Sequence, residues 1–337
     1  MLGVELMGSP RRLLLSVLAL VVLLAPVAAS AAPSSPAPTA TLLRAGLEGA
    51  LGSTVGPDGA LYVTESAAGR ISRVDPRTGD ITTFASGLPR RVVDIGGPVD
   101  VAFVGGTAYA LVTLVGSDVG GDDVVGIYRV DGPNSFTVVA DIGAFSLSNP
   151  PDTSFFVPTG VQYALEVFRG GFLVTDGHHN RVLRVTPDGE ITELLALGNV
   201  VPTGLDVRGN TVYLAQAGPV PHLSEDGKIV KFTPKSSAAT EVASGARLAV
   251  DVEFGRGRSL FALSQGEFDE QAPEGSPALP GTGALLRVEN GGFDVVVDGL
   301  DRPTSLEFIG NTAYVVTFAG EIWKIDNVAR PPYGVSR

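Results

Sequence analysis

Short apolar runs with alternating polar residues recur along this chain, and one of them repeats in six similar copies. The first copy, Ile71-Ser72-Arg73-Val74-Asp75, has an apolar start, a basic third residue and an acid at its end. Alternation with a period of two predicts a half-buried β-strand. The copies span residues 71–75, 127–131, 182–186, 229–233, 285–289 and 322–326. A strand pattern that returns every 40 to 55 residues or so is typical of stacked or radial β architectures, because no single repeat buries its own apolar face.

Each repeat is predicted to contain four strands, of which the basic strand is the third. The first strand is marked by Pro-Thr followed by a small residue, as in Pro202-Thr203-Gly204 and Pro303-Thr304-Ser305, where the proline opens the strand without losing a ladder bond. Glycine-containing turns lead into a second strand that carries a large apolar residue. Fourth strands are expected at residues 81–85, 136–140, 191–195, 240–243 and 293–297, so the sixth repeat lacks one.

The missing strand is expected at the other end of the sequence. Residues 41–47, Thr-Leu-Leu-Arg-Ala-Gly-Leu, are similar to the ends of the fourth strands at 84–88 and 297–300. An unpaired third strand would leave an exposed sheet edge, and pairing with an amino-terminal strand removes it. We therefore predict an all-β fold, a six-bladed β-propeller over residues 41–330 that is closed by an N-terminal strand completing the last blade, with a C-terminal tail at 331–337.

The amino terminus has the pattern of a signal peptide. Arg11 and Arg12 precede an apolar run from Leu13 to Leu24, and small residues follow up to Ala32. This order of charged, apolar and small residues predicts export, with a signal peptide over 1–31 and cleavage near Ala31, or after Ala29. The run is shorter than the roughly 20 residues of a membrane anchor. Residues 32–40 form a Pro/Ser/Ala-rich linker, and we expect a secreted, extracellular protein without a membrane anchor.

Charge and cysteine content limit the classes of binding partner that we expect. The chain has 24 Lys and Arg against 36 Asp and Glu, a net charge of −12, and no Cys. Such a surface repels nucleic acid and anionic membranes, so neither is expected as a partner. Without cysteine the fold must be held by its core and by ring closure, and we expect a monomer.

All three histidines fall in loops that join second to third strands, the face where propellers usually bind ligands. His178, His179 and His222 are therefore candidates for a catalytic base or a metal ligand. The competing interpretation of His178 and His179 is a solvated polar turn. Polar residues at the strand ends and loops of the same face extend the candidate ligand-binding face: Glu65, Asp176, Gln216, Gln265 and Glu267.

Acidic loops offer a weak cation site. Asp122 and Asp123 in the second repeat and Asp269 in the fifth lie in glycine-containing loops, where carboxylates could hold Ca²⁺ or Mg²⁺. The spacing of a calcium-binding loop is absent, and a solvated acidic rim is the alternative.

Two stretches of the first repeat carry a family resemblance. Residues 55–65 (VGPDGALYVTE) and 69–76 (GRISRVDP) resemble the first blade of the ScyD/ScyE family, exported propellers related to NHL repeats, and residues 171–176 with 180–185 are similar to the NHL consensus. The resemblance covers about residues 41–326. It implies the propeller architecture and export, and it implies no particular reaction.

A second resemblance concerns a metal. Glu48-Gly49, followed by residues 69–75, is similar to the start of SMP-30-type lactonases, and this similarity implies that Glu48 is a calcium ligand. The asparagine ligands of that family fall where this chain has Thr159-Gly160 and Thr203-Gly204, so the implied ligand set is incomplete.

Two functions remain open from the sequence. The first is a binding or interaction module whose partner is a protein, a glycan or a small molecule. The second is a metal-assisted hydrolase or lyase of the lactonase or virginiamycin B lyase kind.

Overall fold

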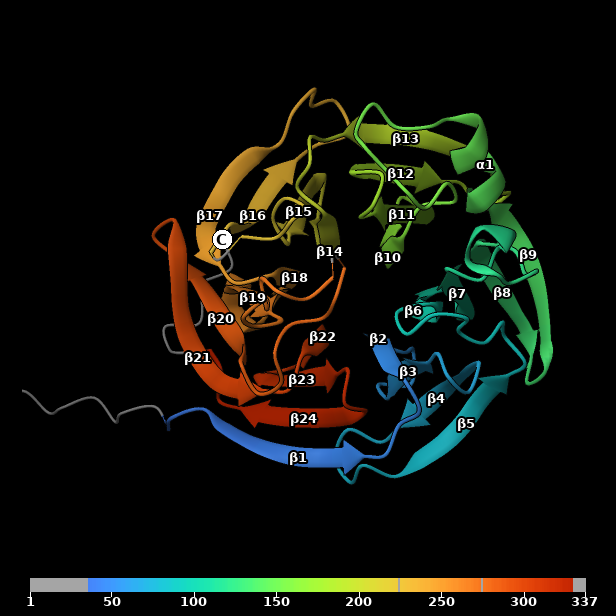
Figure 1. Ribbon diagram of the computed structural model, residues 1–337. Coiled ribbons are helices and arrows are strands. Elements are labelled where there is room, and N and C mark those ends of the chain that lie inside the picture. The colour runs from blue at the N-terminus through green and yellow to red at the C-terminus, as the bar shows by residue number, and fades with distance from the viewer. Residues whose placement is uncertain (1–35, 224, 274, 330–337) are drawn as a thin grey trace, which may run out of the picture. The chain divides into compact units, whose positions relative to one another are not determined.

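A computed structural model describes residues 36–329 except 224 and 274. Six four-stranded antiparallel sheets stand around a central axis like the blades of a propeller (Figure 1). The all-β, six-bladed fold predicted from the repeats is confirmed. The signal peptide, its cleavage near Ala31 and the tail at 331–337 lie outside the described residues.

Every blade runs from an inner strand at the axis to an outer strand at the rim. Blade one contains β2 (Ala50–Val55), β3 (Leu61–Glu65), β4 (Arg70–Val74) and β5 (Ile81–Ser86). Blade two contains β6 (Gly97–Val104), β7 (Thr107–Thr113), β8 (Gly126–Gly132) and β9 (Ser135–Asp141). Blade three contains β10 (Gln162–Phe168), β11 (Gly171–Asp176), β12 (Arg181–Val185) and β13 (Ile191–Ala196).

The second half of the ring repeats this order. Blade four contains β14 (Pro202–Arg208), β15 (Thr211–Gln216), β16 (Gly227–Phe232) and β17 (Thr240–Ala246). Blade five contains β18 (Ala249–Phe254), β19 (Leu260–Ser264), β20 (Gly283–Glu289) and β21 (Gly292–Leu300). Blade six contains β22 (Pro303–Ile309), β23 (Thr312–Thr317) and β24 (Glu321–Asp326), and its outer strand is β1 (Thr39–Ala45).

The ring closes as the sequence predicts. Strand β1 pairs antiparallel with β24, from Thr39 opposite Asp326 to Ala45 opposite Glu321, with a bulge between Leu42 and Arg44. The strand begins two residues before the expected residue 41. Because one blade is built from both ends of the described chain, closure protects the edge that β24 would otherwise expose.

The apolar core lies between neighbouring blades. Between blades one and two, for example, the ring of Tyr62 meets Phe84 and Phe103 edge-on at centroid distances of 4.9 and 4.7 Å. Basic residues of four third strands pair with nearby acids, among them Arg73 with Asp58 at 2.6 Å and Arg129 with Asp131 at 2.6 Å. We therefore assign the repeated basic residue a structural role in the blades.

One feature of the fold has no counterpart in the periodicity. A seven-residue helix, α1 (Ile142–Ser148), follows β9. The Asp141 carboxylate caps it by accepting from the Ala144 N–H at 2.8 Å. Seven residues are too few to show a sustained 3.6-residue period. Short 3₁₀ turns, η1 (Ser117–Val119) and η2 (Arg256–Arg258), lie in other loops. Within residues 36–329, no helix is long and apolar enough to cross a membrane.

Candidate functional site

The centre of the ring holds a cavity of about 1040 Å³. Its wall is built by the inner strands, and its mouth by the connections between blades and the loops that join second to third strands. This is the face on which the sequence placed the histidines. Deep cavities of this size are the usual form of small-molecule sites.

Apolar side chains from two connections between blades lie together at the mouth of the cavity. Val93 and Ile95 come from the connection before β6, and Phe155 and Phe156 from the connection before β10. Phe156 is 69% exposed, the largest exposed fraction among the large apolar side chains. Exposed aromatic side chains gathered at a hollow, rather than scattered singly, mark a surface that gains from being covered.

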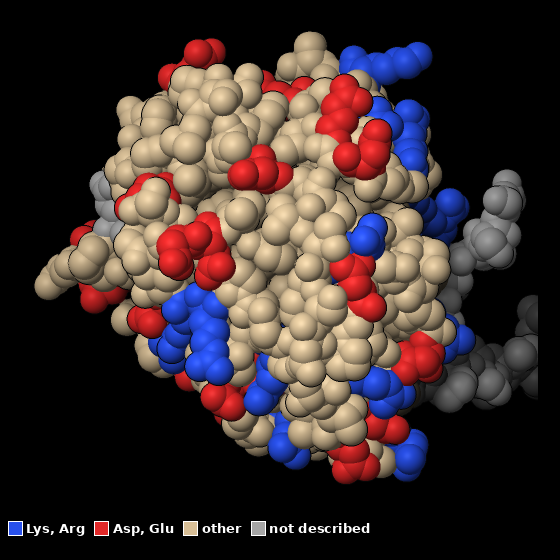
Figure 2. All heavy atoms as spheres, turned by 90° about the vertical axis from the view of Figure 1, so that its right-hand side faces the viewer, with Lys and Arg blue, Asp and Glu red and all other residues tan. Residues whose placement is uncertain are grey.

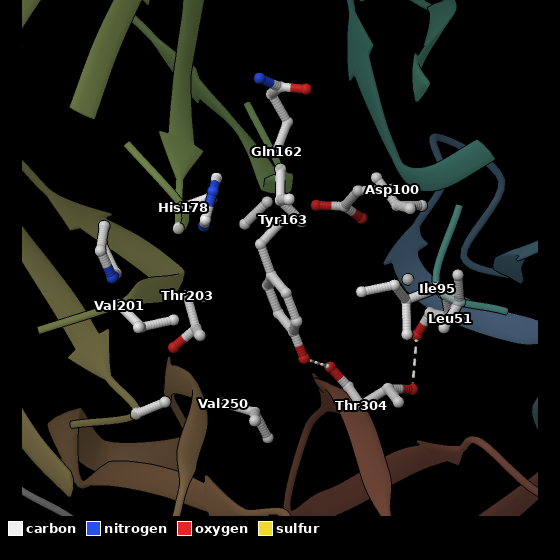
Figure 3. A pocket seen from close by; sticks show the side chains of 18 of the residues that line it. Leu51, Ile95, Asp100, Gln162, Tyr163, His178, Val201, Thr203, Val250 and Thr304 are labelled. Atoms are coloured by element: carbon white, nitrogen blue, oxygen red, sulfur yellow. Dashed lines mark hydrogen bonds between the residues drawn. The ribbon is translucent and has the colours of Figure 1, made fainter. Parts of the chain in front are cut away.

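A tyrosine crosses the middle of the cavity. The side chain of Tyr163 extends from β10 in blade three towards blade six on the opposite side of the ring (Figure 3). Its hydroxyl donates to the carbonyl oxygen of Thr304 in β22 at 3.0 Å. The Thr304 hydroxyl in turn donates to the carbonyl oxygen of Leu51 in β2 at 2.6 Å. These bonds join three inner strands across the axis and present one ring face to whatever enters.

Acidic residues occupy one position on four consecutive inner strands. The fifth residue of each of β10, β14, β18 and β22 is an acid: Glu166, Asp206, Glu253 and Glu307. Two further acids, Asp100 of β6 and Asp251 of β18, stand two residues nearer the mouth than this level. All of them except Asp206 line the cavity.

Three of these carboxyls also connect neighbouring blades. Asp100 accepts from the backbone N–H of Leu165 at 2.7 Å, Asp206 from Phe254 at 2.8 Å and Asp251 from Leu306 at 2.8 Å. In each case the N–H belongs to the inner strand of the next blade. Gly204 makes room for this arrangement, because a Cβ there would stand 2.1 Å from Asp251 Oδ1.

Burial changes the protonation of the cavity acids. Burial raises the pKa of Asp100 to about 7, against the bonds from Leu165 and Val101. Burial, together with the charges of neighbouring acids, raises the pKa of Glu166, Asp251, Glu253 and Glu307 well above the ordinary carboxyl range. None of the described residues that line the cavity is a Lys or Arg that could offset this repulsion. Buried carboxyls of this kind are characteristic of functional sites.

The ring of His178 lines the cavity, and its Nε2 is already engaged. That nitrogen accepts from the backbone N–H of Phe156 at 2.8 Å and of Val157 at 3.1 Å. Burial lowers the pKa of His178 below its ordinary value, so the ring is neutral at pH 7. The Nε2 lone pair therefore holds the connection that carries Phe155 and Phe156 at the mouth, and these two bonds already use it.

The neighbouring histidine lies in the protein interior. His179 is 2% exposed, with Nε2 3.0 Å from the carbonyl oxygen of Val157 and Nδ1 3.1 Å from Arg181 Nη2. The Asp176 carboxylate is fully buried and lies 3.2 Å from His179 Nδ1 and 3.5 Å from Arg181 Nε. The interpretation of this segment as a solvated turn is wrong, because Asp176, His179 and Arg181 form a closed polar cluster behind the cavity wall.

The other residues expected at the ligand-binding face separate into two groups. Gln265 lines the cavity, and its Oε1 accepts from the Ala278 N–H at 3.0 Å. Glu65 is fully buried and accepts from Arg70, from Ser72 and from the Glu48 N–H. Gln216 is buried at the end of β15, and Glu267 is exposed and paired with Arg247. The structure therefore brings only Gln265 of this set, with His178 and His222, into the cavity wall.

The proposed metal ligands do not meet. Glu48 is exposed and lies 3.3 Å from the Arg70 guanidinium, while Asp122, Asp123 and Asp269 are exposed on loops of blades two and five. In the part of the chain that the structure describes, no three His, Asp or Glu side chains are arranged to hold a metal ion. The residues present do not fit the Ca²⁺ or Mg²⁺ site that the lactonase resemblance implies.

The inner-strand acids and Tyr163 are the residues that the sequence reasoning missed. A signal for them exists, since an acid recurs at the fifth position of four consecutive inner strands, on segments that otherwise read as buried. An ionisable residue repeated inside an apolar strand costs stability, and such a cost is typical of residues that serve a site.

No protein-family model matches the sequence, and no curated protein matches it either. Solved structures match over most of the ring. Virginiamycin B lyase from Staphylococcus aureus is 16% identical with a TM-score of 0.52, covering 86% of this chain and 98% of that one. The PQQ-bound aldose sugar dehydrogenase from Streptomyces coelicolor is 15% identical with a TM-score of 0.59, covering 87% and 99%. A gluconolactonase from Xanthomonas campestris is 14% identical with a TM-score of 0.59, covering 85% and 89%.

These similarities establish the class of protein. The chain is a six-bladed β-propeller, similar in fold to lactonases, lyases and sugar dehydrogenases. At such identities the likeness concerns the fold, and the function has to be argued from the cavity itself.

Proposed function

We propose that this protein is an exported ligand-binding propeller of the ScyD/ScyE type that takes a small organic molecule into its central cavity. The observation that carries the proposal is the cavity of about 1040 Å³ with an aromatic mouth. A concave, largely apolar hollow with a few polar groups suits a small molecule better than a protein surface, which usually buries a broader and flatter area.

The mouth supplies apolar area and the interior supplies orientation. Phe155 and Phe156 can cover an apolar body, whereas the hydroxyls and carboxyls of the inner strands can fix its polar end. His178 supports this role, since its two bonds from Phe156 and Val157 hold the aromatic connection in place without a ligand. A preformed mouth lowers the entropy that binding would otherwise cost.

A thermal-shift screen of small organic molecules against the purified protein tests this function. Ligands of the cavity should raise the melting temperature, and Phe156→Ala should weaken them by about tenfold if about 1.4 kcal/mol of contact is lost. Leu147→Ala is the matched control, because Leu147 is 60% exposed on α1 and does not line the cavity. Ligands that lose equal affinity in both variants, or that bind neither more nor less in Phe156→Ala, would contradict a site at this mouth.

Export is a separate part of the proposal and rests on the amino-terminal pattern. Amino-terminal sequencing of the protein recovered from culture medium should give Ala32 as the first residue, with Ser30 as the outcome of the alternative cleavage. Protein found only inside cells would contradict it.

A hydrolase or lyase is the second candidate, favoured by the presence of His222 in the cavity wall. The metal that such chemistry would use lacks a fitting ligand set in the described residues. PQQ, bound by the Streptomyces dehydrogenase, carries three carboxylates, and a cavity lined by acids does not fit it. Millimolar Ca²⁺ or Mg²⁺ should leave the melting temperature unchanged. A gain that disappears in His222→Ala or Glu48→Ala would favour the enzyme.

A further inference from the structure

The charged groups of the cavity all have one sign. Six acids line it: Asp100, Asp118, Glu166, Asp251, Glu253 and Glu307. Among the described residues, none of those that line the cavity is Lys or Arg. The chain as a whole carries 24 basic residues, and the side of the ring that bears β9 and α1 shows acidic and basic side chains intermixed (Figure 2). A hollow with low-dielectric walls focuses the field of such charges, so the sign of the lining selects the sign of the ligand.

Not all six acids are equally free to meet a ligand. Asp118 already accepts from the N–H and the hydroxyl of Thr159, at 3.0 and 2.8 Å. Asp100 and Asp251 each accept two backbone N–H groups. Glu166, Glu253 and Glu307 are half-buried in the cavity wall. Glu166 accepts from the Val167 N–H and Glu253 shares a hydrogen bond with Asp206, while the charges that raise the pKa values of all three come from other acids. An incoming positive charge would reduce the electrostatic repulsion at these three carboxyls.

An aromatic ring lies close to Asp100 and Asp251, whose charges act on its hydroxyl. The Tyr163 ring stands in the middle of the cavity, with the Asp100 carboxyl beside it (Figure 3). The hydrogen bond to Thr304 fixes the ring from the far side. The face of a tyrosine ring attracts an organic cation, and more strongly where water is displaced.

We propose that the ligand of this cavity is an organic cation, a protonated amine or a quaternary ammonium group carried on an apolar body. The apolar body lies against Phe155 and Phe156 at the mouth, and the cationic end reaches the Tyr163 ring and the carboxyls of Glu166, Glu253 and Glu307. This inference rests on the proposed binding function and adds the chemical class of the ligand.

The protonation of the acids agrees with this class. Burial, together with the charges of Asp251, Glu166, Asp100 and Asp206 on the other inner strands, raises the pKa of Glu307 and favours its neutral form. A bound cation favours the ionised carboxyls, so binding releases protons. Affinity for a permanent cation should therefore rise with pH as Glu166, Glu253 and Glu307 ionise, and fall at lower pH.

Three probes with one apolar body and different heads test the class by calorimetry at pH 8: 4-phenylbutylammonium, 4-phenylbutan-1-ol and 5-phenylpentanoate. The ammonium probe should bind about tenfold more tightly than the alcohol, since about 1.4 kcal/mol of electrostatic and cation–π attraction suffices for that ratio. The carboxylate should bind more weakly than the alcohol.

Charge-neutral variants locate the effect. Glu253→Gln/Glu307→Gln keeps the shape of the protonated acids, and it should reduce the advantage of ammonium over alcohol to about threefold or less while leaving the alcohol affinity unchanged. Glu166→Gln alone should give an intermediate ratio. Glu190→Gln/Glu241→Gln removes two exposed acids outside the cavity and should leave the ratio as in the parent.

The outcomes separate the two proposals. If none of the three probes binds, the cavity is not a ligand site and both proposals fall. If the alcohol or the carboxylate binds as tightly as the ammonium, the binding function stands and the cationic class is overturned. An ammonium preference that the Glu190→Gln/Glu241→Gln control removes as fully as the cavity variant would assign it to the outer surface and overturn the class as well.

Discussion

Two sets of buried carboxyls in this propeller have the same chemistry and opposite electrostatics. Asp176 and Glu65 lie at the ends of β11 and β3, where burial would raise their pKa values. For Asp176, hydrogen bonds and charges from His179 and Arg181 outweigh burial and lower the pKa. For Glu65, Arg70, the Glu48 N–H and Ser72 do the same. Glu253 and Glu307 in the cavity wall lie among other acids, and burial together with those charges raises their pKa values.

The difference shows which acids build the fold and which serve the site. The paired acids join a second strand to a third strand and to the next loop, so removing a partner should damage the native state. The cavity acids repel one another, so neutralising them should stabilise the empty protein at high pH. Retaining groups that cost stability is the usual mark of a binding site.

The largest effect is expected when the buried pair is broken. Arg181→Ala leaves the Asp176 carboxylate without its guanidinium and also removes the bonds to Asn149 and Ser146. The loss should be about 3–5 kcal/mol of unfolding free energy, as for other broken buried pairs. Urea unfolding measures it, with Arg184→Ala of the same strand as the control. Equal losses in the two variants would remove the distinction between paired and unpaired acids.

A smaller loss is expected at the first blade. Glu65→Gln weakens the hydrogen bonds to Arg70 and should cost about 1–3 kcal/mol at pH 7. The pKa of Glu65 is lowered on folding, so its contribution is present above the ordinary carboxyl pKa and disappears as pH falls through the folded value. The difference between parent and variant should therefore shrink in thermal unfolding below about pH 4. A pH-independent difference would contradict an ionised Glu65.

The cavity acids should respond in the opposite sense. Their raised pKa values mean that stability is full below the unfolded carboxyl pKa and is lost as pH rises through the folded values. Glu253→Gln/Glu307→Gln should thus gain about 1–2 kcal/mol at pH 9 and nothing at pH 4, since these acids are half-buried and partly screened. Calorimetric melting at both pH values checks this, and a lower melting temperature at pH 9 would show that these carboxyls stabilise the ring.

The smallest effect concerns the residue that crosses the cavity. Tyr163→Phe removes only the bond to the Thr304 carbonyl and should cost about 1 kcal/mol, or about 2–4 °C of melting temperature. Tyr213→Phe in the wall of blade four is the control. If Tyr163→Phe costs as little as the control, the hydrogen bond across the axis does not hold the ring in place.

Local sequence patterns are enough to predict the propeller, the strand order within each blade and the strand that closes the ring. These features follow from local rules: alternation with a period of two, turn residues at hairpins, and a sixth repeat in which the fourth strand is missing. The short helix α1 was not predicted, because an Asp141 cap followed by seven residues is too short a segment to show a helical period.

The candidate site, in contrast, depends on contacts between distant parts of the chain. Whether His179 and Asp176 face water or the interior depends on α1 and the next connection, which cover them and lie about 30 residues earlier in the chain. The cavity is likewise lined by three to five residues from each of the six inner strands. These strands are separated by about 50 residues, so no local window contains the cavity. Only closure of the ring brings Tyr163 to Thr304 and gathers the acids of blades two to six around one axis.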